Sequence, residues 1–304
     1  MKLMVMSILP IVLCLALGYG LGLLLPRHQI RHGAKLLTPL IWLLLFFCGK
    51  EFGHALGDGE ILIKSLTTAL TFAILTALLP WILILLCIRL PRANTAPVVA
   101  VKLPAVQFFH ALRDCMIALA MITMGVLASK YQGLWLNGVT AAQLLYALIF
   151  LVGMDLVQLE FDGRQHASEL VWVPMLVIIG SMVGGVIAGF YTGEGVLTSL
   201  ALSSGFGWVT LSSILVSGKL GSSYGAIAML TDLFREMIAI IMLYVLGSRF
   251  SREAIGICGA TALDATLPLI RQKCGSQHVL LALISGFVLT LTSPALILIF
   301  LVGN

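Results

Sequence analysis

The segment AIAMLTDLFREMIAIIMLYVLG, residues 226–247, has the length and apolar character of a helix that spans a membrane. Its middle nevertheless carries three ionisable residues, Asp232, Arg235 and Glu236. Charge is costly inside a bilayer, so ionisable residues there usually face the protein interior and mark an ion or proton site. This segment therefore predicts both a membrane fold and a charged site within it.

The composition of the chain supports the membrane assignment. Hydrophobic residues make up 60% of the 304 residues and charged residues only 10%, whereas a soluble domain has about 25% charged residues. We therefore predict an all-α polytopic membrane protein. The net charge of +5 fits basic cytoplasmic loops, and no basic run alternates with aromatic residues, so no nucleic acid partner is predicted. The six scattered cysteines predict neither disulfides nor a metal site.

Apolar segments long enough to cross the bilayer predict about eight transmembrane helices. A polar linker that contains prolines, 89–111, separates the third from the fourth. We divide the chain into a scaffold-like half, 1–191, and a core or transport half, 195–304. The predicted helices cover residues 3–25, 36–54, 62–88, 112–129, 138–157, 170–191, 222–247 and 278–302.

Two further segments are apolar but broken. Residues 195–218 contain SSGFG, and residues 253–271 contain CGATALDATLP. Irregular backbone at membrane depth needs protein or a water-filled cavity to supply hydrogen bonds, and pairs of such segments indicate the binding site of a transporter. Either both segments span, or both enter and return on one side. The second arrangement places every loop arginine in the cytoplasm, so we favour two re-entrant hairpins, with both termini outside.

This arrangement also indicates an internal repeat. The segment LLLFFCGKEF (43–52) resembles ALIFLVGMDL (147–156), three predicted helices later. An odd offset makes helices 1–3 and 4–6 inverted copies, and the two hairpin and helix pairs after them also have opposite orientations. The alternative is chance, because F-x-x-G is common in membrane helices. Glu51 and Asp155, near the ends of the matching segments, are secondary site candidates; the alternative is ordinary solvated helix ends.

The charged residues define the main candidate site. Asp232, Arg235 and Glu236 fall within an arc of about 100° on a helix, and Asp264 lies in the second broken segment. One interpretation is a neutral cluster that fixes helix packing, with Asp232 paired to Arg235. However, three carboxylates outnumber one guanidinium. At least one acid should therefore take up a proton near physiological pH, and the surplus negative charge suits a cationic ligand.

Three motifs in the last third of the chain resemble those of a known family. SSGFGW, DLFREMIAII and ICGATALDATLP occur in this order and are similar to motifs of the LysO-type lysine exporters of bacterial inner membranes. The resemblance is dense over about 199–300 and sparse before it. It implies export of L-lysine, driven by proton entry without a cofactor. It also implies that Glu236 and Asp264 are the essential acids.

The charge of lysine agrees with that mechanism. A substrate with net charge +1 leaves against an inside-negative potential, at about 2.3 kcal/mol per 100 mV, and exchange for a proton cancels this charge movement. A carboxylate that binds either the proton or the cation couples the two fluxes. We expect helix N-termini at the breaks, or else Arg235, to bind the α-carboxylate, and loose carbonyl and hydroxyl groups to bind the ammonium groups. The expected contacts are Ser204, Gly205, Gly207, Trp208 (a gate, or only a packing residue), Thr210, Ser212, Gly259, Thr261, Thr266 and Pro268.

Two other functions remain as alternatives. A sodium–proton antiporter also uses broken helices and two acids, and an intramembrane aspartyl protease would use Asp232 with Asp264, although neither lies in a GxGD-like setting. We favour a transporter over an enzyme. Its expected partners are L-lysine and related cationic amino acids, protons and membrane lipid, and a homo-oligomer is compatible with the sequence.

The division into halves also predicts how transport occurs. By analogy at fold level with glutamate-transporter-like elevators, residues 195–304 would form a mobile carrier. Its hairpin tips, near Gly205 and Ala262, should then lie together beside Glu236. Rocking of helices around crossed broken helices is the alternative.

Overall fold

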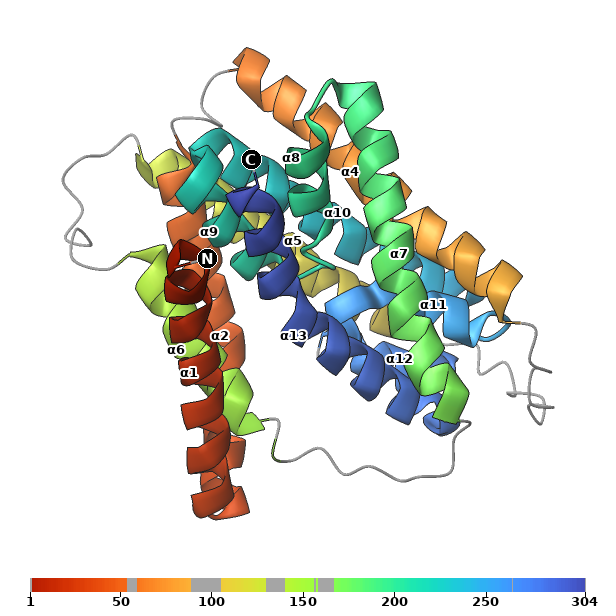
Figure 1. The fold of residues 1–304 in the computed structure, drawn as a ribbon. Coiled ribbons are helices and arrows are strands. Elements are labelled where there is room, and N and C mark those ends of the chain that lie inside the picture. The colour runs from red at the N-terminus through yellow and green to blue at the C-terminus, as the bar shows by residue number, and fades with distance from the viewer. Residues whose placement is uncertain are drawn as a thin grey trace.

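The computed structural model describes residues 2–53, 59–88, 105–129, 140–155, 157, 167–263 and 265–303. Within these ranges all regular structure is helical and no strand occurs, which confirms the predicted all-α class. Figure 1 shows long helices packed against one another, with α1, α2 and α6 on one flank and α4 crossing α7 on the other.

The elements follow one another as helices of very different length. The N-terminal part consists of long helices, and the C-terminal part alternates short and long ones. In chain order they are α1 (Lys2–Leu24), α2 (Arg27–Glu51), α4 (Gly59–Cys87), α5 (Ala105–Ser129), α6 (Ala141–Asp155), α7 (Ala167–Thr192), α8 (Val196–Ser203), α9 (Val209–Leu220), α10 (Ser222–Leu246), α11 (Ser251–Cys258), the 3-10 helix η2 (Gly259–Leu263), α12 (Leu267–Lys273), the 3-10 helix η3 (Ser276–His278) and α13 (Val279–Val302).

Two helix starts differ from the sequence prediction. Helix α2 begins at Arg27, before the apolar segment 36–54, because a helix can extend beyond the apolar residues that it contains. Helix α5 begins at Ala105, inside the predicted linker 89–111, directly after a proline. A proline is tolerated at or just before a helix start, where its missing N–H group is not needed. The rest of that linker, 89–104, lies outside the described residues.

Three described helices are long and apolar enough to cross a membrane: Leu62–Cys87 in α4, Ser168–Thr192 in α7 and Val279–Val302 in α13. Shorter apolar stretches lie in α2, α5 and α9. Helix α10 has 25 residues, about 37 Å at 1.5 Å per residue, and differs from these spans by its central charges. The chain is thus a helical membrane protein, and the predicted number of spans remains a prediction.

Glycines allow α4 and α7 to cross at close range. Gly180 and Gly184 of α7 lie against the backbone of α4 at Pro80 and Leu75, and a Cβ at either glycine would come within 3.0 Å of that backbone. Small residues permit such close helix approach in membranes. Near the crossing, the Ser181 hydroxyl donates to the Thr76 carbonyl at 3.4 Å. Ser181 also accepts a hydrogen bond from Arg235, so this crossing determines the position of one contact of the charged site.

The helices of the N-terminal flank are joined by two similar glycine contacts. Gly18 of α1 lies against the Phe150 backbone of α6, and Gly125 of α5 lies against the Phe46 backbone of α2. Phe46 and Phe150 are the residues that align in the predicted repeat. If helices 1–3 are exchanged with helices 4–6, one contact becomes the other. The arrangement of these four helices is therefore compatible with two related copies.

Helices α4 and α7 pack against the C-terminal elements as well as against each other. One buried apolar cluster joins Ile84 of α4 and Val177 of α7 to Phe206, Ile257 and Leu281 from the last third of the chain. The buried ion pair between Glu169 of α7 and Arg252 of α11, at 2.8 Å, adds a polar contact between the same parts. The broken segments thus pack against the α4 and α7 pair.

The α4 and α7 crossing makes a prediction about stability. Gly184→Ala should lower the free energy of unfolding by about 1–3 kcal/mol, because the added methyl group meets backbone that cannot move aside. Gly20→Ala on α1 is the matched control, since a Cβ there has no neighbour within 4 Å. It should leave stability unchanged or raise it by up to about 1 kcal/mol, as alanine favours helix over glycine. Thermal unfolding in detergent measures both, and equal effects would contradict the packing described.

Candidate functional site

The first broken segment consists of α8 and α9 with an irregular turn between them. Helix α8 ends at Ser203 and α9 begins at Val209. Phe206 and Gly207 between them both have positive φ, 51° and 91°. This conformation suits glycine but is unfavourable for phenylalanine, so the surrounding contacts must hold the turn in place.

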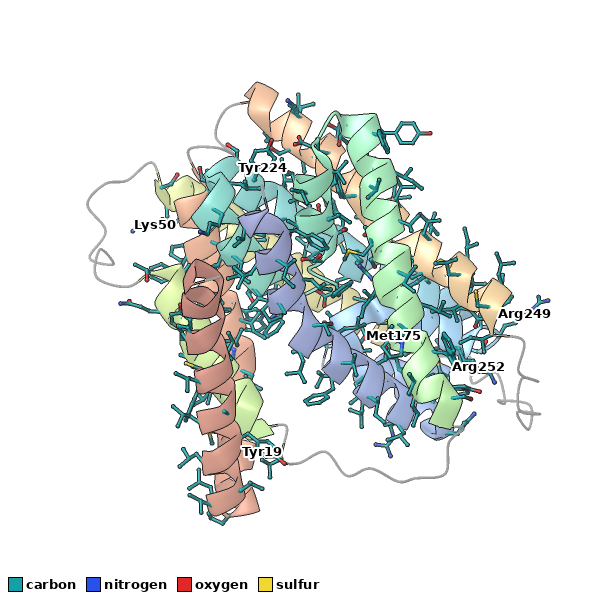
Figure 2. The ribbon with its side chains drawn as sticks, viewed as in Figure 1. Tyr19, Lys50, Met175, Tyr224, Arg249 and Arg252 are labelled. Carbon is teal, nitrogen blue, oxygen red and sulfur yellow. The ribbon has the colours of Figure 1, made fainter. Side chains whose placement is uncertain are left out.

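Both ends of this segment lie together. Before α8, Glu194 accepts a hydrogen bond from the hydroxyl of Tyr224, which lies in the first turn of α10 after α9, at 2.9 Å. The chain from 195 to 220 therefore folds back on itself, as a hairpin does. Figure 2 places Tyr224 far from Arg249 and Arg252, which lie beyond the other end of α10.

The second broken segment has the same form at that other end. Helix α11 ends at Cys258, Gly259 turns the chain with a φ of +62°, and α12 starts at Leu267. At the end of α12, the Lys273 ammonium group lies 3.9 Å from the ring centroid of Tyr244, near the end of α10. The two ends of this segment therefore also meet.

The tips of the two hairpins touch in the interior. The Ala260 N–H group donates to the Phe206 carbonyl at 2.8 Å, and a Cβ on Gly259 would overlap that same carbonyl. Gly207 lies close to Thr261 in the same region. The expectation that the tips near Gly205 and Ala262 lie together is thus confirmed. Helix α10 passes beside this junction and presents Asp232 and Arg235 to it.

Asp232 is bound to the start of α9. Its carboxylate accepts a hydrogen bond from Gly207 N–H at 2.8 Å and another from the Ser212 hydroxyl, and only 1% of the residue is exposed. A Cβ on Gly205 would overlap the carboxylate, so glycine is required there. The N-terminal end of a helix favours negative charge, and this accounts for the buried aspartate.

Arg235 lies one turn further along α10 and is also buried. Its Nη1 donates to the Ser181 hydroxyl at 3.1 Å and its Nε to the Ile257 carbonyl at 3.5 Å. Its Cζ lies 5.8 Å from the ring centroid of Phe206, within range of a cation–π interaction. Although both side chains are described, no ion pair within 4.0 Å joins Arg235 to Asp232. The Asp232 carboxylate instead accepts its hydrogen bonds from Gly207 N–H and the Ser212 hydroxyl.

Glu236 occupies a different environment from its neighbours on α10. The residue is partly exposed, and its charge is close enough to act on Cys258 at the end of α11. Asp264 lies outside the described residues, so its position relative to Glu236 remains a prediction. The same holds for the side chains of Glu51, Asp155 and Pro268, of which only the helical backbone is described.

Most other predicted contact residues support the breaks themselves. The Thr261 hydroxyl donates to Cys258 carbonyl at 2.8 Å, and Thr266 donates to Thr261 carbonyl at 3.0 Å. Thr210 is buried in the first turn of α9, and its carbonyl accepts from Ser213. These groups stabilise the irregular backbone that burial would otherwise leave unpaired.

The turn before α9 is fixed in a similar way. The Ser204 hydroxyl donates to Leu200 carbonyl at 2.6 Å, and its own carbonyl accepts from Ser293 of α13 at 2.8 Å. Trp208 is partly buried and packs against the buried apolar residues on both sides of the turn. Packing therefore accounts for Trp208 in this structure.

Sequence reasoning missed two contributors from outside the broken segments. Ser181 of α7 donates to the Thr76 carbonyl and accepts from Arg235, and Ser293 of α13 bonds to the first turn. Both are small polar residues within apolar spans. Serine in such a span often bonds across helices, so this signal was present but did not show the partner.

The geometry of the broken segments and the buried charges defines a class of protein. A helical membrane protein that joins two broken segments beside buried charges has the architecture of a secondary transporter. A family model described as lysine exporter LysO matches residues 116–301. This is more than half of the chain, and the chain therefore belongs to the lysine exporter LysO family. The predicted family is confirmed.

Two relatives show how far the similarity extends. The chain is 38% identical over 158 residues to the lysine exporter LysO of Escherichia coli, an alignment that covers 51% of this chain and 53% of the relative. It is 32% identical over 189 residues to a putative lysine exporter of Haemophilus influenzae, covering 60% of this chain and 95% of the relative. The first alignment thus spans about half of the Escherichia coli protein. No solved structure matches the chain.

The Asp232 contacts make a prediction about the first hairpin. Ser212→Ala should lower the free energy of unfolding by about 1–3 kcal/mol, because the buried carboxylate loses one of two hydrogen bonds. Ser203→Ala is the control, since that hydroxyl bonds only to Leu200 carbonyl in its own helix and such bonds add little stability. Thermal unfolding measures the stability of the two variants. A smaller loss of stability in Ser212→Ala than in Ser203→Ala would refute the role given to Asp232.

Proposed function

We propose that this chain exports L-lysine, and related cationic amino acids, from the cytoplasm in exchange for protons. The observation that carries the proposal is the placement of Asp232 and Arg235 of α10 at the junction of the two hairpin tips, with Glu236 next to Arg235 in the same helix. The names of the two relatives supply the substrate. No cofactor is needed, because the proton gradient provides the energy.

Glu236 is the acid of α10 best suited to exchange a ligand. Asp232 is almost fully buried and both of its oxygens accept hydrogen bonds, so it is committed to holding the first hairpin. Glu236, about one turn further along α10, is partly exposed. A cation or a proton reaches its carboxylate without breaking the bonds of Asp232. Asp264, assigned from the family resemblance, is proposed as the second acid.

A shared carboxylate explains why the two fluxes are coupled. Export of a substrate with net charge +1 against an inside-negative potential costs about 2.3 kcal/mol per 100 mV. Entry of one proton for each lysine removes this electrical cost. If Glu236 binds either the proton or the substrate ammonium group, the two cannot be bound at the same time. Each can therefore cross only after the other has been released. Competition for one group thus gives exchange rather than leak.

We further propose about eight spans with two re-entrant hairpins that enter from opposite sides of a bacterial inner membrane. The meeting of each hairpin's two ends at Tyr224 and at Lys273 supports this arrangement. Trp172 and Tyr191 are exposed near opposite ends of α7, where aromatic residues mark the two membrane interfaces. The basic residues then place both chain termini outside.

The paired glycine contacts support an inverted repeat of helices 1–3 and 4–6. Gly18 with Phe150 and Gly125 with Phe46 are equivalent contacts under that exchange. Inverted copies allow two states of similar energy, one open to each side. We propose that residues 195–304 move as a carrier against a scaffold from 1–191. Because α4 and α7 pack closely on the carrier, we infer that these two helices move with it and that the other helices of residues 1–191 form the scaffold.

The alternatives fit the geometry less well. An aspartyl protease needs a carboxylate free to activate water, whereas both oxygens of Asp232 accept bonds from α9. We therefore propose a transporter and not an enzyme. A sodium–proton antiporter uses a similar architecture and is separated from a lysine exporter by substrate. A homo-oligomer is compatible with this proposal and is not required by it.

Transport itself is the direct test. Purified protein in liposomes should exchange labelled L-lysine for protons, and Glu236→Gln and Asp264→Asn should each abolish the exchange, because each keeps the side-chain size but removes the titratable charge. Glu60→Gln, in the first turn of α4, is the control and should retain the wild-type rate. Size-exclusion profiles establish that the variants fold. Full exchange by either acid variant would remove that acid from the mechanism, and sodium-dependent proton flux without lysine would favour the antiporter.

Labelling of the ends of α10 tests the hairpin arrangement. In a background without native cysteines, Ser248→Cys should react with an impermeant reagent only from the cytoplasm and Ser222→Cys only from outside. Both serines are exposed, and they lie at opposite ends of the same helix. Labelling of Ser248→Cys from the outer side would instead indicate that both broken segments span.

A further inference from the structure

We propose that Arg235 receives the α-carboxylate of the transported amino acid. This assignment rests on the proposed lysine export and names the residue that recognises the head group of the substrate. It starts from a buried polar atom: Nη2 of Arg235 has no hydrogen-bond partner among the described residues. A guanidinium group carries five N–H donors, and the contacts to Ser181 and Ile257 use only two of them.

The other candidate for the carboxylate is already in use. The N-terminal end of α9 would bind an anion through its free N–H groups, but Asp232 occupies it through Gly207 N–H and the Ser212 hydroxyl. The helix α12 has only seven residues and begins with Leu267 and Pro268, and proline has no N–H group to offer. With the N-terminal ends of α9 and α12 excluded, Arg235 is the group that binds the α-carboxylate.

The surroundings of Nη2 suit a planar anion. Gly259 adjoins it, and a Cβ built on that glycine would lie 3.5 Å from Nη2, so any larger residue would fill this space. Ser181 holds Nη1 on one side, and the Phe206 ring lies near Cζ. The guanidinium is thereby fixed in orientation, with N–H groups left to donate. A planar fork of two N–H groups matches the two oxygens of a carboxylate, which a lysine side chain cannot reproduce.

The assignment separates recognition of the head group from recognition of the side chain. Arg235 and Glu236 are adjacent on α10, so their side chains leave the helix about 100° apart. Arg235 binds the negative end of the substrate, and Glu236 binds its positive side chain. Both Phe206 and Gly259, which flank Arg235, belong to the hairpin tips, so binding of a carboxylate and the positions of the two tips depend on one another.

The test compares substrates that differ only in the carboxylate. In proteoliposomes, exchange of labelled L-lysine is measured against L-lysine, L-lysinamide and pentane-1,5-diamine as competitors. The wild-type protein should prefer L-lysine over both analogues by about 10-fold or more, as expected for a lost charge-assisted hydrogen bond pair. In Arg235→Gln, the apparent affinity for L-lysine should fall by about 10-fold while that for lysinamide changes little, so that the preference for L-lysine disappears. Arg235→Lys should keep part of it, because charge remains without the planar fork.

Two controls keep the test decisive. Arg249→Lys alters an exposed arginine that lies over the Phe250 ring, outside the site, and should keep the wild-type preference. Ser181→Ala removes the anchor of Nη1 and should reduce the preference for L-lysine several-fold. Ser181→Ala also decides the question if the Arg235 variants do not fold. For variants that fold without transporting, the rise of the melting temperature with each compound replaces the flux measurement.

The outcomes distinguish this assignment from the proposed function. Wild-type protein that exchanges lysine but does not prefer it over lysinamide overturns the role of Arg235 and leaves lysine export intact. An unchanged preference in Arg235→Gln, or in Ser181→Ala if the Arg235 variants do not fold, overturns the assignment as well. If the wild-type protein does not exchange lysine at all, the proposed function fails and the assignment fails with it.

Discussion

The bond between the Asp232 carboxylate and the start of α9 is the interaction on which the site depends. It joins a continuous helix, α10, to the irregular turn of the first hairpin through Gly207 N–H and the Ser212 hydroxyl. In a membrane, a broken helix survives only where protein supplies the missing hydrogen bonds. Here a charged acceptor supplies one of them, to Gly207 N–H, and also accepts from the Ser212 side chain, and burial in a region of low dielectric strengthens each bond. The acid, in turn, is stabilised by the N-terminal end of the helix that it holds.

The second hairpin is placed by the first. Once the turn at Phe206 is fixed, its carbonyl accepts from Ala260, and the missing Cβ of Gly259 allows the two tips to approach. Arg235 then lies between the Phe206 ring and the Ile257 carbonyl. The order of dependence therefore runs from Asp232, through the two tips, to Arg235. A change at any of these points is transmitted to the others, because interiors packed at this density do not yield gradually.

The same arrangement gives the two acids of α10 different surroundings. Asp232 and Glu236 are four residues apart in sequence, and both could have been proton carriers on the basis of composition alone. Asp232 is buried and accepts two hydrogen bonds from the first hairpin, whereas Glu236 is partly exposed. The polar groups of Thr261, Thr266 and Ser204 are likewise used by backbone close to them. The hydrogen-bond partners thus identify the polar groups that hold the breaks.

The sequence by itself determined the class of the protein and the location of its breaks. Hydrophobic content, segment length and positions such as Gly207 and Gly259 are local properties, and local rules of helix formation and membrane partition act on them directly. The partners were decided only by tertiary structure. Asp232 accepts hydrogen bonds from N–H and hydroxyl groups that lie 25 and 20 residues earlier in the chain, and Arg235 donates to Ser181 on α7. Periodicity places residues on a helix face, but it does not show which distant backbone group reaches a carboxylate first. That choice depends on the close crossing of α4 with α7 and on the meeting of two hairpin tips, neither of which exists before the helices pack.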